Sequence, residues 1–425
     1  MTSVKLDMVE LTVERVGARG DGLAVYEGKP VYLAFAAPGD HVRARLGASR
    51  NEGRLGTVVE ILIPGARQPP SCPHFGTCGG CALQHLADDA YRDMKEGSVR
   101  AALERRGLDA SVVEPLRRLP PGTRRRARLA LRRPRKGPLR AGFHARESHE
   151  IVDMQVCTVL HPALVSLVSP LRECAVRLLH QGEAGTAMLT RVDSGLDVLF
   201  ELPRVPDMTV LETLAKFADA NDLARLSWRV DEQPPTPVAE RRRPCVIFAG
   251  VAVEVPADGF LQASAEADSV LTELVLPGVG SAARVIDLYA GLGTFTFALA
   301  QRAPTHAVDG ARSAIAALTS AAAHATLGGR VTAEVRDLET RPVMADELRR
   351  YDAAVFDPPR TGAKAQTRAL AASQMSKVVA VSCNPATFGR DARTLVDGGY
   401  RLTRVMPVDQ FPWSAQVELV AWFER

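Results

Sequence analysis

The chain has 425 residues, 46% of them hydrophobic, and a formal net charge of only +4 at pH 7. This length allows two or three domains, and the composition is ordinary for a soluble globular protein. No segment approaches the roughly 18 consecutive apolar residues that span a membrane, and the N-terminus lacks the basic start and apolar core of a secretory signal. We therefore expect a cytoplasmic protein with no membrane contact, and no obligate protein partner is evident.

Residues 1–65 are expected to form a small all-β unit. Their β-prone runs are short and are separated by glycine, aspartate and proline, which favour turns. Short strands at this spacing fit a small OB-like barrel, which is a common platform for nucleic acids. The runs are 9–16, 22–26, 30–35, 41–46 and 56–62.

Residues 66–270 mix helical and strand-like stretches, which predicts a central α+β domain. The helical stretches include 90–106 and 211–221, and the strand-like ones include 188–202 and 246–255. The order in which these strands pair cannot be read from the sequence.

A basic segment lies inside this central region. From Arg117 to Arg146 the chain has eleven arginines, one lysine and no acidic residue. Such a concentration of positive charge attracts a polyanion, although a solvated basic face is the plainer interpretation. Arg124, Arg126 and Arg128 alternate as one face of a strand would, and this arrangement would suit a strand lying along a phosphate backbone.

Residues 271–425 alternate regularly between strand-like and helical stretches. This pattern predicts an α/β domain with a doubly wound parallel sheet, covered on both faces, that binds its ligands beyond the carboxyl ends of the strands. The strand-like stretches followed by helical ones are 285–288, 306–308, 331–335, 353–356 and 378–381. Two further strand-like stretches, 401–408 and 417–423, have no long helix between them.

A glycine-containing turn closes the first of these strands, in the pattern Asp287-x-x-x-Gly291-x-Gly293. Glycines there let the backbone approach a ligand closely. A dinucleotide fingerprint would have a glycine where this chain has Thr296, which weakens an NAD interpretation. Asp309 and Asp337 follow the next two strands, and this order resembles the class I S-adenosylmethionine methyltransferases.

Cys383 follows the fifth strand, where the expected ligand pocket opens, and it precedes a helical stretch. A position near a helix N-terminus would favour its thiolate. Asp357-Pro358-Pro359 ends the fourth strand and could indicate an amino-group methyltransferase, but those enzymes usually have an aromatic residue where this chain has Arg360. An arginine there and a cysteine one strand later suit methylation at carbon.

These motifs resemble the RNA uracil-5-methyltransferase family along nearly the whole chain. The matching segments are 260–262, 287–294, 308–310, 357–362, 382–385 and 411–418. The resemblance implies a methyl transfer from S-adenosylmethionine to carbon 5 of a uridine, with Cys383 as nucleophile at carbon 6 and Glu418 as the base. It further implies a cofactor and reaction pocket lined by Gln262, Tyr289, Thr294, Asp309, Asp337 and Asp357.

Three positions depart from the family pattern. Asp309 replaces a glutamate, Ser264 replaces an asparagine, and Gln416 replaces a histidine two residues before Glu418. None of them removes the nucleophile. The change at 416 leaves open how the side chain of Glu418 is oriented.

Four cysteines form a separate set: Cys72, Cys78 and Cys81, with Cys157 as a fourth member. Four thiolates hold zinc as well as iron–sulfur clusters, so the spacing does not identify the metal. The resembled family has the same Cys-x5-Cys-Gly-Gly-Cys segment with a distant cysteine, and there it binds a [4Fe–4S] cluster. We therefore expect [4Fe–4S] here, and we expect Cys174 and Cys245 to be buried hydrophobic residues.

The sequence as a whole predicts three domains: a TRAM- or OB-like barrel over 1–65, a cluster-bearing α+β domain over 66–270 and a class I methyltransferase domain over 271–425. In the resembled family, the barrel together with the four cysteines favours the enzyme of large-subunit ribosomal RNA, and the transfer RNA enzyme is the nearest alternative. A hypothesis of another class is a non-catalytic iron–sulfur protein that binds RNA.

Overall fold

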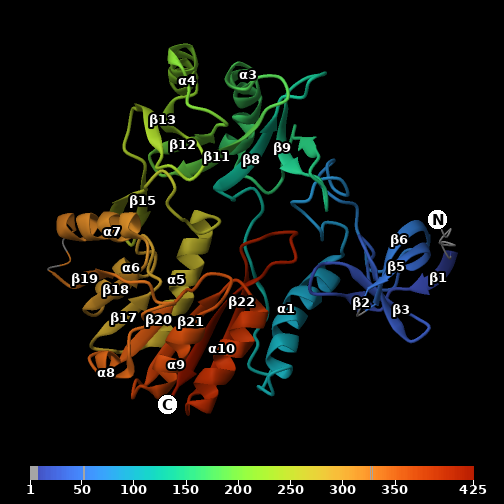
Figure 1. The fold of residues 1–425 in the computed structure, drawn as a ribbon. Coiled ribbons are helices and arrows are strands. Elements are labelled where there is room, and N and C mark those ends of the chain that lie inside the picture. Colours follow the sequence, from blue (N-terminus) through green and yellow to red (C-terminus); the bar gives the residue numbers. More distant parts are fainter. Residues whose placement is uncertain (1–7, 51–52, 326, 328) are drawn as a thin grey trace.

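The computed structural model describes residues 8–50, 53–325, 327 and 329–425. It contains three large sheets and one separate hairpin. Figure 1 shows the middle sheet next to the C-terminal sheet, with the N-terminal strands on the far side of helix α1 (Asp88–Glu104). None of the helices in the described residues combines the length and the apolar character needed to cross a bilayer.

The N-terminal sheet has the strand order β1-β5-β6-β4-β3-β2. The run 9–16, expected as one strand, forms two, because the chain changes its partner within the run: the Val13 N–H donates to Asp40 O at 2.9 Å and the Glu14 N–H to Leu23 O at 2.8 Å. The OB-like barrel stays a prediction, and residues 1–7 and 51–52 lie outside the described residues. The strands are β1 (Met8–Thr12), β2 (Arg15–Val16), β3 (Gly22–Tyr26), β4 (Lys29–Leu33), β5 (His41–Arg50) and β6 (Gly53–Ile63).

The middle sheet has the order β10-β9-β8-β11-β12-β13-β14, and three helices complete its apolar core. The run 188–202, expected as one strand, is the antiparallel pair β11 and β12, because the chain reverses between Val192 and Gly195. The strands are β8 (Arg126–Arg132), β9 (Arg140–His144), β10 (Ile151–Asp153), β11 (Ala184–Val192), β12 (Gly195–Glu201), β13 (Leu223–Arg229) and β14 (Thr236–Glu240). The helices are α2 (Pro162–Ser166), α3 (Val168–Leu178) and α4 (Met208–Ala220).

The run 246–255 was also expected as one strand and is instead a hairpin of β15 (Cys245–Phe248) and β16 (Val251–Glu254). Its two turn residues, Ala249 and Gly250, have φ angles of 49° and 84°. Positive φ at both positions is the geometry of a tight turn whose twist matches that of the two strands. The β-prone residues on both sides hid this turn in the sequence.

The C-terminal sheet has the order β19-β18-β17-β20-β21-β23-β22-β7 and is parallel except for β23. This confirms the predicted doubly wound α/β sheet, and the strand order is the one that the class I methyltransferase resemblance implies. The strands are β17 (Val285–Leu288), β18 (Thr305–Asp309), β19 (Val331–Val335), β20 (Ala353–Phe356), β21 (Lys377–Ser382), β22 (Arg401–Asp409), β23 (Glu418–Glu424) and β7 (Arg117–Arg118). The helices are α5 (Ala265–Val279), α6 (Thr296–Ala300), α7 (Arg312–His324), α8 (Ala345–Leu348), α9 (Lys364–Ala372) and α10 (Pro385–Asp397).

Successive residues of the central strands enter two different cores. In β21, Val378 and Ala380 pack with α9 and α10, whereas Val379 and Val381 pack with α5. A strand that is buried on both faces needs a continuous apolar run, and this explains the absence of alternation in these strands.

Helix α1 packs on the C-terminal sheet although it precedes the middle sheet in sequence. Its Tyr91, Met94 and Leu103 share one core with Phe388 and Leu395 of α10. The strand β7 likewise pairs with the end of β22. Along the sequence, α1 and β7 therefore pack with the C-terminal sheet although both precede the strands of the middle sheet. The limits of the three domains stay a prediction.

Candidate active site and cysteine cluster

The turn after β17 is built from left-handed backbone. Tyr289, Gly291 and Gly293 have φ angles of 61°, 55° and 93°. A Cβ at Gly293 would lie 2.6 Å from the ring of Phe297, so only glycine fits there. Asp287, which is fully buried, accepts a 2.6 Å hydrogen bond from Thr296 at the start of α6 and so fastens the turn.

Asp309 links the end of β18 to this turn. One of its carboxylate oxygens accepts from the Gly291 N–H at 2.9 Å, and the other accepts from the Ala311 N–H at 2.7 Å. Asp337 is exposed and accepts from the Glu339 N–H and the Thr340 hydroxyl, which lower its pKa. Both acids therefore lie at the carboxyl edge of the sheet, as the sequence predicted.

The half-buried Tyr289 lies close to several acids. Burial raises the pKa of its hydroxyl, and Asp391, Glu339, Asp337 and Asp309 raise it further. A site surrounded by carboxylates in this way favours a positively charged ligand. Thr294, also half-buried, lies in the same turn at the carboxyl edge of the sheet, near the other residues expected to line the cofactor pocket.

The reaction side of the edge is a chain of hydrogen bonds. Gln262 Nε2 donates to Asp357 Oδ2 at 2.8 Å. Gln410 Nε2 donates to Gln262 Oε1 at 3.1 Å and to Glu418 Oε2 at 2.6 Å. These residues come from three separate parts of the chain: the segment before α5, the end of β20 and the paired strands β22 and β23.

Gln410 is the site residue that the sequence reasoning missed. It directly precedes the Phe411-Pro412 pair that contributed to the family resemblance. The antiparallel register pairs Val408 of β22 with Glu418 of β23, which explains how Gln410 reaches Glu418. A single sequence contains no signal of that pairing beyond two adjacent strand-like runs.

Cys383 follows β21 directly and precedes Asn384, the N-cap of α10. Burial raises the pKa of its thiol to about 11, Glu418 and Asp357 add to this, and Arg360 opposes it. Burial and two carboxylates therefore oppose the thiolate that the position near the helix N-terminus is expected to favour, and that expectation stays a prediction. The sheet register brings Cys383, Glu418 and Asp357 together. Ser382 of β21 pairs with Leu419 of β23, beside Cys383 and Glu418, and β20, which ends just before Asp357, pairs with β21.

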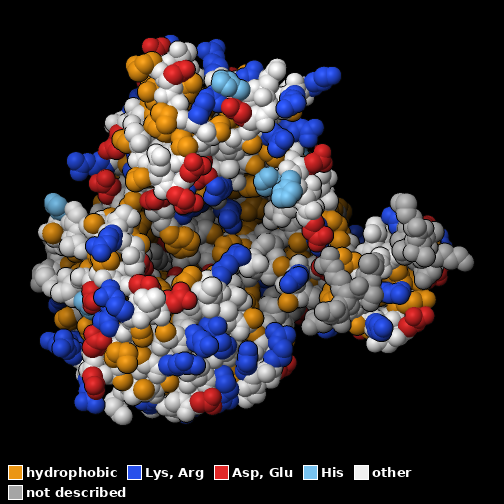
Figure 2. Space-filling model, in the orientation of Figure 1, with side chains coloured by type: hydrophobic (Ala, Val, Ile, Leu, Met, Phe, Trp, Pro, Cys, Tyr) orange, Lys and Arg blue, Asp and Glu red, His pale blue; other side chains and the backbone are white. Residues whose placement is uncertain are grey.

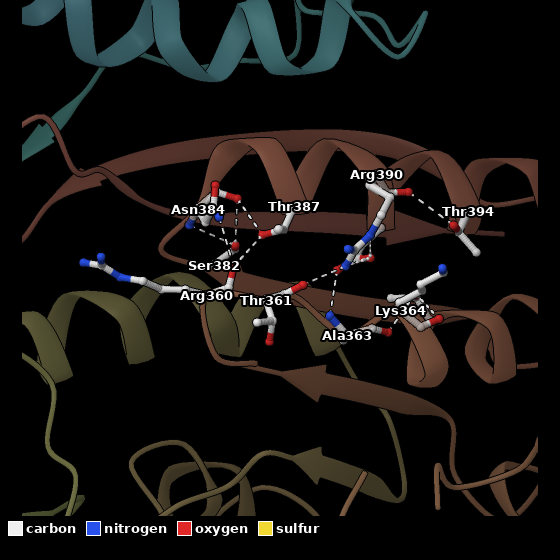
Figure 3. Close-up of polar contacts among 11 residues, drawn as sticks. Arg360, Thr361, Ala363, Lys364, Ser382, Asn384, Thr387, Arg390 and Thr394 are labelled. Atoms are coloured by element: carbon white, nitrogen blue, oxygen red, sulfur yellow. Dashed lines mark hydrogen bonds and ion pairs between the residues drawn. The ribbon is translucent and has the colours of Figure 1, made fainter. Parts of the chain in front are cut away.

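The segment that carries Arg360 is tied to α10 (Figure 3). The backbone oxygen of Arg360 accepts from Asn384 Nδ2 at 2.9 Å and from the Thr387 hydroxyl at 3.2 Å. Arg390 donates to the oxygen of Thr361 at 3.0 Å. These bonds fix the backbone while the guanidinium of Arg360 extends away from them, as Figure 3 shows.

The four predicted cysteine ligands meet in one place. Cys72, Cys78, Cys81 and Cys157 are half-buried and line a cavity of about 330 Å³. The loop that contains the first three is joined to β9, because the Gly79 N–H donates to His144 O at 2.9 Å. Burial raises the pKa of Cys78, Cys81 and Cys157, and neighbouring cysteines of the set raise it further.

This cavity adjoins the loop between β22 and β23. Phe411, Pro412 and Ser414 of that loop line the cavity together with Arg124. The guanidinium of Arg124 lies 6.0 Å from the centre of the Phe411 ring. The cysteine set and the residues around Glu418 thus share one loop.

Comparison with known proteins identifies the family. The family model of the tRNA (uracil-5-)-methyltransferases matches residues 251–425. A protein of Caulobacter vibrioides, named as an RNA methyltransferase, is 41% identical over 98% of this chain and 100% of its own length. The 23S rRNA (uracil(1939)-C(5))-methyltransferase RlmD of Chromohalobacter salexigens is 35% identical over 98% of this chain and 89% of its own length. The chain belongs to the RNA uracil-5-methyltransferase family.

A solved structure agrees with the fold of this methyltransferase. The tRNA (uracil-54, C5)-methyltransferase of Pyrococcus abyssi, in complex with S-adenosyl-L-homocysteine, matches with a TM-score of 0.74. The two are 22% identical, and the match covers 97% of this chain and 99% of that one. This likeness shows the fold. Membership of the RNA uracil-5-methyltransferase family makes the chain an S-adenosylmethionine-dependent RNA uracil-5-methyltransferase.

The basic segment of this methyltransferase is arranged differently from the expectation. Arg124 and Arg126 are half-buried, and the exposed Arg128 pairs with Glu201 of β12, which is separated from β8 by β11. The three alternating arginines are therefore not equally open to a polyanion. The exposed cations of the segment that form no ion pair among the described residues lie around the β8–β9 hairpin: Arg132, Arg135, Lys136 and Arg140.

Figure 2 shows a hollow between the middle and C-terminal parts of the methyltransferase, with hydrophobic side chains inside it. Lys and Arg side chains gather on the face of the C-terminal part below this hollow. A polyanion that reaches the site would meet positive charge on that side.

Replacing Arg360 by glutamine should make Cys383 less reactive at a given pH. The change removes the positive charge that lowers the thiol pKa, so the pKa rises further and the thiolate forms at higher pH. We expect the pH dependence of iodoacetamide alkylation at Cys383, followed by peptide mass spectrometry, to move upward by about half a unit to one unit. Lys364→Gln, at the other end of the same segment (Figure 3), is the control and should leave the curve in place. Identical alkylation of Arg360→Gln and the unchanged protein at every pH would contradict this account.

Proposed function

We propose that this enzyme methylates carbon 5 of a uridine in 23S ribosomal RNA through a transient bond between Cys383 and the uracil ring. The observation that carries the proposal is the meeting of Cys383, Asp357 and Glu418 at one edge of the sheet, two of them joined through Gln262 and Gln410. A nucleophile, a carboxylate for the uracil edge and a base are the groups that this reaction needs.

The first task of the site is to make carbon 5 nucleophilic. Addition of the Cys383 sulfur to carbon 6 breaks the carbon 5–carbon 6 double bond and turns the ring into an enolate. Asp357, held by Gln262, faces the uracil edge and keeps the ring in place for this attack. S-adenosylmethionine supplies, when bound, a methyl group on a positively charged sulfur.

The second task is to restore the ring. Glu418 removes the proton from carbon 5, and the electron pair of that C–H bond re-forms the carbon 5–carbon 6 double bond. The carbon 6–sulfur bond breaks, and its electron pair returns to Cys383. Burial and the nearby Asp357 raise the pKa of Glu418, which makes it a stronger base than an exposed glutamate.

In this proposal, S-adenosylmethionine binds at the other half of the carboxyl edge of the C-terminal sheet, beside the turn after β17. Tyr289, Thr294 and Asp309 surround the turn after β17, and Asp337 follows β19. The carboxylates near Tyr289 suit the positive charge of the cofactor. The target uridine must leave its base stack to reach Cys383, which costs a few kcal/mol in a duplex and less in a loop.

We further propose that the cysteine set holds a [4Fe–4S] cluster. Four thiols line one cavity, and the Gly80 N–H lies 3.4 Å from the sulfur of Cys78. Among the described residues, no three His, Cys, Asp or Glu side chains are arranged as a ready metal site. Four thiols suit zinc as well as a cluster, and the choice of [4Fe–4S] rests on the Cys-x5-Cys-Gly-Gly-Cys resemblance. Such a cluster would join the loop of Cys72 to the segment after β10 and support folding and RNA docking.

Anaerobic reconstitution with iron and sulfide should load this set. We expect about four iron and four sulfide per chain, with visible absorption of an iron–sulfur centre. Cys157→Ala should bind much less iron, because it removes one ligand, whereas Cys245→Ser keeps all four. One zinc per chain without sulfide would reject the cluster.

The preference for ribosomal RNA rests on the relative from Chromohalobacter salexigens, which is matched over nearly the whole chain. Transfer RNA is the second candidate, because the matching family model and the Pyrococcus abyssi structure are both of tRNA enzymes. The TRAM-like interpretation of the N-terminal sheet supports an RNA-docking unit in either case.

Methyl transfer to isolated RNA tests the substrate. The purified enzyme is incubated with labelled S-adenosylmethionine and either 23S rRNA or tRNA from cells that lack 5-methyluridine. The proposal expects 5-methyluridine at one position of 23S rRNA and little in tRNA. Methylation of tRNA alone would overturn the choice of substrate, and RNA binding without any transfer would favour the non-catalytic hypothesis.

A further inference from the structure

The buried carboxylate of Glu418 is held on one side only. Its side chain is 2% exposed, and Oε2 accepts the 2.6 Å hydrogen bond from Gln410. Its other oxygen, Oε1, has no hydrogen-bond partner among the described residues. Burying a polar atom without a hydrogen-bond partner costs free energy, so such an atom calls for an explanation. The two carboxylate oxygens differ here: Oε2 is held by Gln410, whereas Oε1 is left open.

The orientation of the Gln410 amide follows from its neighbours. Gln410 is itself buried, and its Oε1 accepts from the Ala263 N–H at 3.3 Å. Nε2 must therefore be the donor, and its two N–H groups match two acceptors, Gln262 Oε1 and Glu418 Oε2. Since Gln262 Oε1 is used as an acceptor, Gln262 donates with its own nitrogen to Asp357.

This direction of donation limits where Glu418 can carry a proton. Oε2 faces a donor and can only accept, so a proton can lie only on Oε1. The oxygen that is free of partners is thus the one able to receive the carbon 5 proton. A carboxylate that could rotate would lose this distinction between its two oxygens.

Position 416, where the family pattern has histidine, does not hold Glu418 in this protein. The backbone oxygen of Gln416 accepts from Lys95, and its N–H donates to the Ser414 hydroxyl at 3.2 Å. Gln416 also lines a groove between the N-terminal sheet and α1. The structure thereby answers the question that the substitution at 416 raised.

We propose that Gln410 is the positioning residue for Glu418, that it fixes Oε2 so that Oε1 takes the carbon 5 proton, and that it ties this base to the uracil-holding Asp357 through Gln262. This inference rests on the proposed covalent mechanism and names the residue that controls its last step.

The groups facing Glu418 set the sign of the expected pH effect. Burial and Asp357 raise its pKa, and the Gln410 hydrogen bond and Arg360 lower it. Cys383 is the other titratable group near it. Loss of the donor, or a negative charge in its place, raises the pKa of Glu418 further, so proton removal requires a higher pH.

Two variants test the proposal. Gln410→Met keeps the length of the side chain without its donors, and Gln410→Glu keeps the acceptor for Ala263 but places a carboxylate against Glu418. Each is compared with the unchanged enzyme and with Gln416→Ala for trapping by 5-fluorouridine RNA, methyl incorporation in the first turnover, and release of tritium from carbon 5 of labelled uridine.

For Gln410→Met and Gln410→Glu, we expect trapping and first-turnover methylation to stay within about twofold of the unchanged enzyme. Tritium release should be slower by about tenfold or more in both variants. Both variants should accumulate a methylated covalent complex with ordinary RNA. The acidic limb of tritium release should move to higher pH, most strongly for Gln410→Glu. Gln416→Ala should match the unchanged enzyme.

Tritium release at the normal rate in both Gln410 variants would overturn the inference. Equal loss of trapping and of tritium release would overturn it as well, because Gln410 would then only support the fold. If the unchanged enzyme methylates RNA without ever being trapped, the covalent mechanism itself fails, whatever the variants do.

Discussion

Replacing Cys383 by serine should reduce uracil methylation by at least about 10⁴-fold, because a hydroxyl is a far weaker nucleophile toward carbon 6 than a thiolate. The fold should persist, since Cys383 is only half-buried and follows the strand β21 rather than lying in a core. The variant should also fail to form a denaturant-resistant complex with RNA that contains 5-fluorouridine. The fluorine cannot leave as a proton does, so the unchanged enzyme should stay bound through residue 383.

Single-turnover methylation and mass spectrometry of the trapped peptide measure this effect. Cys174 is buried as expected, but the same expectation is wrong for Cys245, which starts the β15–β16 hairpin and is half-buried. Cys245→Ser is therefore the matched control for the half-buried Cys383. It should methylate RNA at nearly the normal rate and should be trapped normally. Retention of more than about a tenth of the activity in Cys383→Ser would show that the reaction does not need this nucleophile.

Replacing the buried Lys95 should lower the free energy of unfolding more than the other substitutions proposed for this protein. Lys95 lies on α1, is fully buried and donates to Asp409 at 2.8 Å and to the backbone oxygens of Phe411 and Gln416. Tyr91, one turn earlier, donates to the same Asp409 and accepts from the Trp413 N–H. These contacts fasten the loop that has Gln410 at one end and Glu418 at the other.

Lys95→Met should lower the free energy of unfolding of the part that contains α1 by about 3–5 kcal/mol, because it leaves the buried Asp409 without its cationic partner. Arg92→Ala, on the same helix, removes the exposed pair with Asp88 and should cost less than about 1 kcal/mol. Urea denaturation compares the two variants, and hydrogen exchange of the 409–418 peptide reports the loop itself. Equal stability of both variants, with unchanged exchange in that peptide, would refute this account of α1.

The alternation of strand-like and helical runs was sufficient to predict the C-terminal fold. In a doubly wound sheet the parallel strands follow one another through helices, so their carboxyl ends meet at one edge without further information. Asp309, Asp357 and Cys383 could therefore be placed at this edge from their positions alone. The turns inside 188–202 and 246–255 were missed, since strong β-formers lie on both sides of each turn.

The basic segment shows the limit of reading charge from sequence. Arg124, Arg126 and Arg128 were expected to alternate on one face of a strand, but Arg128 pairs with Glu201 at the end of β12. Glu201 lies 73 residues further along the chain. A partner this far along the chain leaves no trace in the local pattern of charge.

The amino-acid sequence by itself determined the family, the class I fold and the two motifs that end in Asp357 and Cys383, because these depend on local patterns along one stretch of chain. Only the tertiary structure decided how Glu418 is held. The antiparallel strand β23 lies between β21 and β22, which brings Glu418 to Cys383 on one side and to Gln410 on the other. Helix α1 then fixes the intervening loop through Lys95. Contacts between segments hundreds of residues apart depend on which surfaces pack together, and no local pattern of residues records that choice.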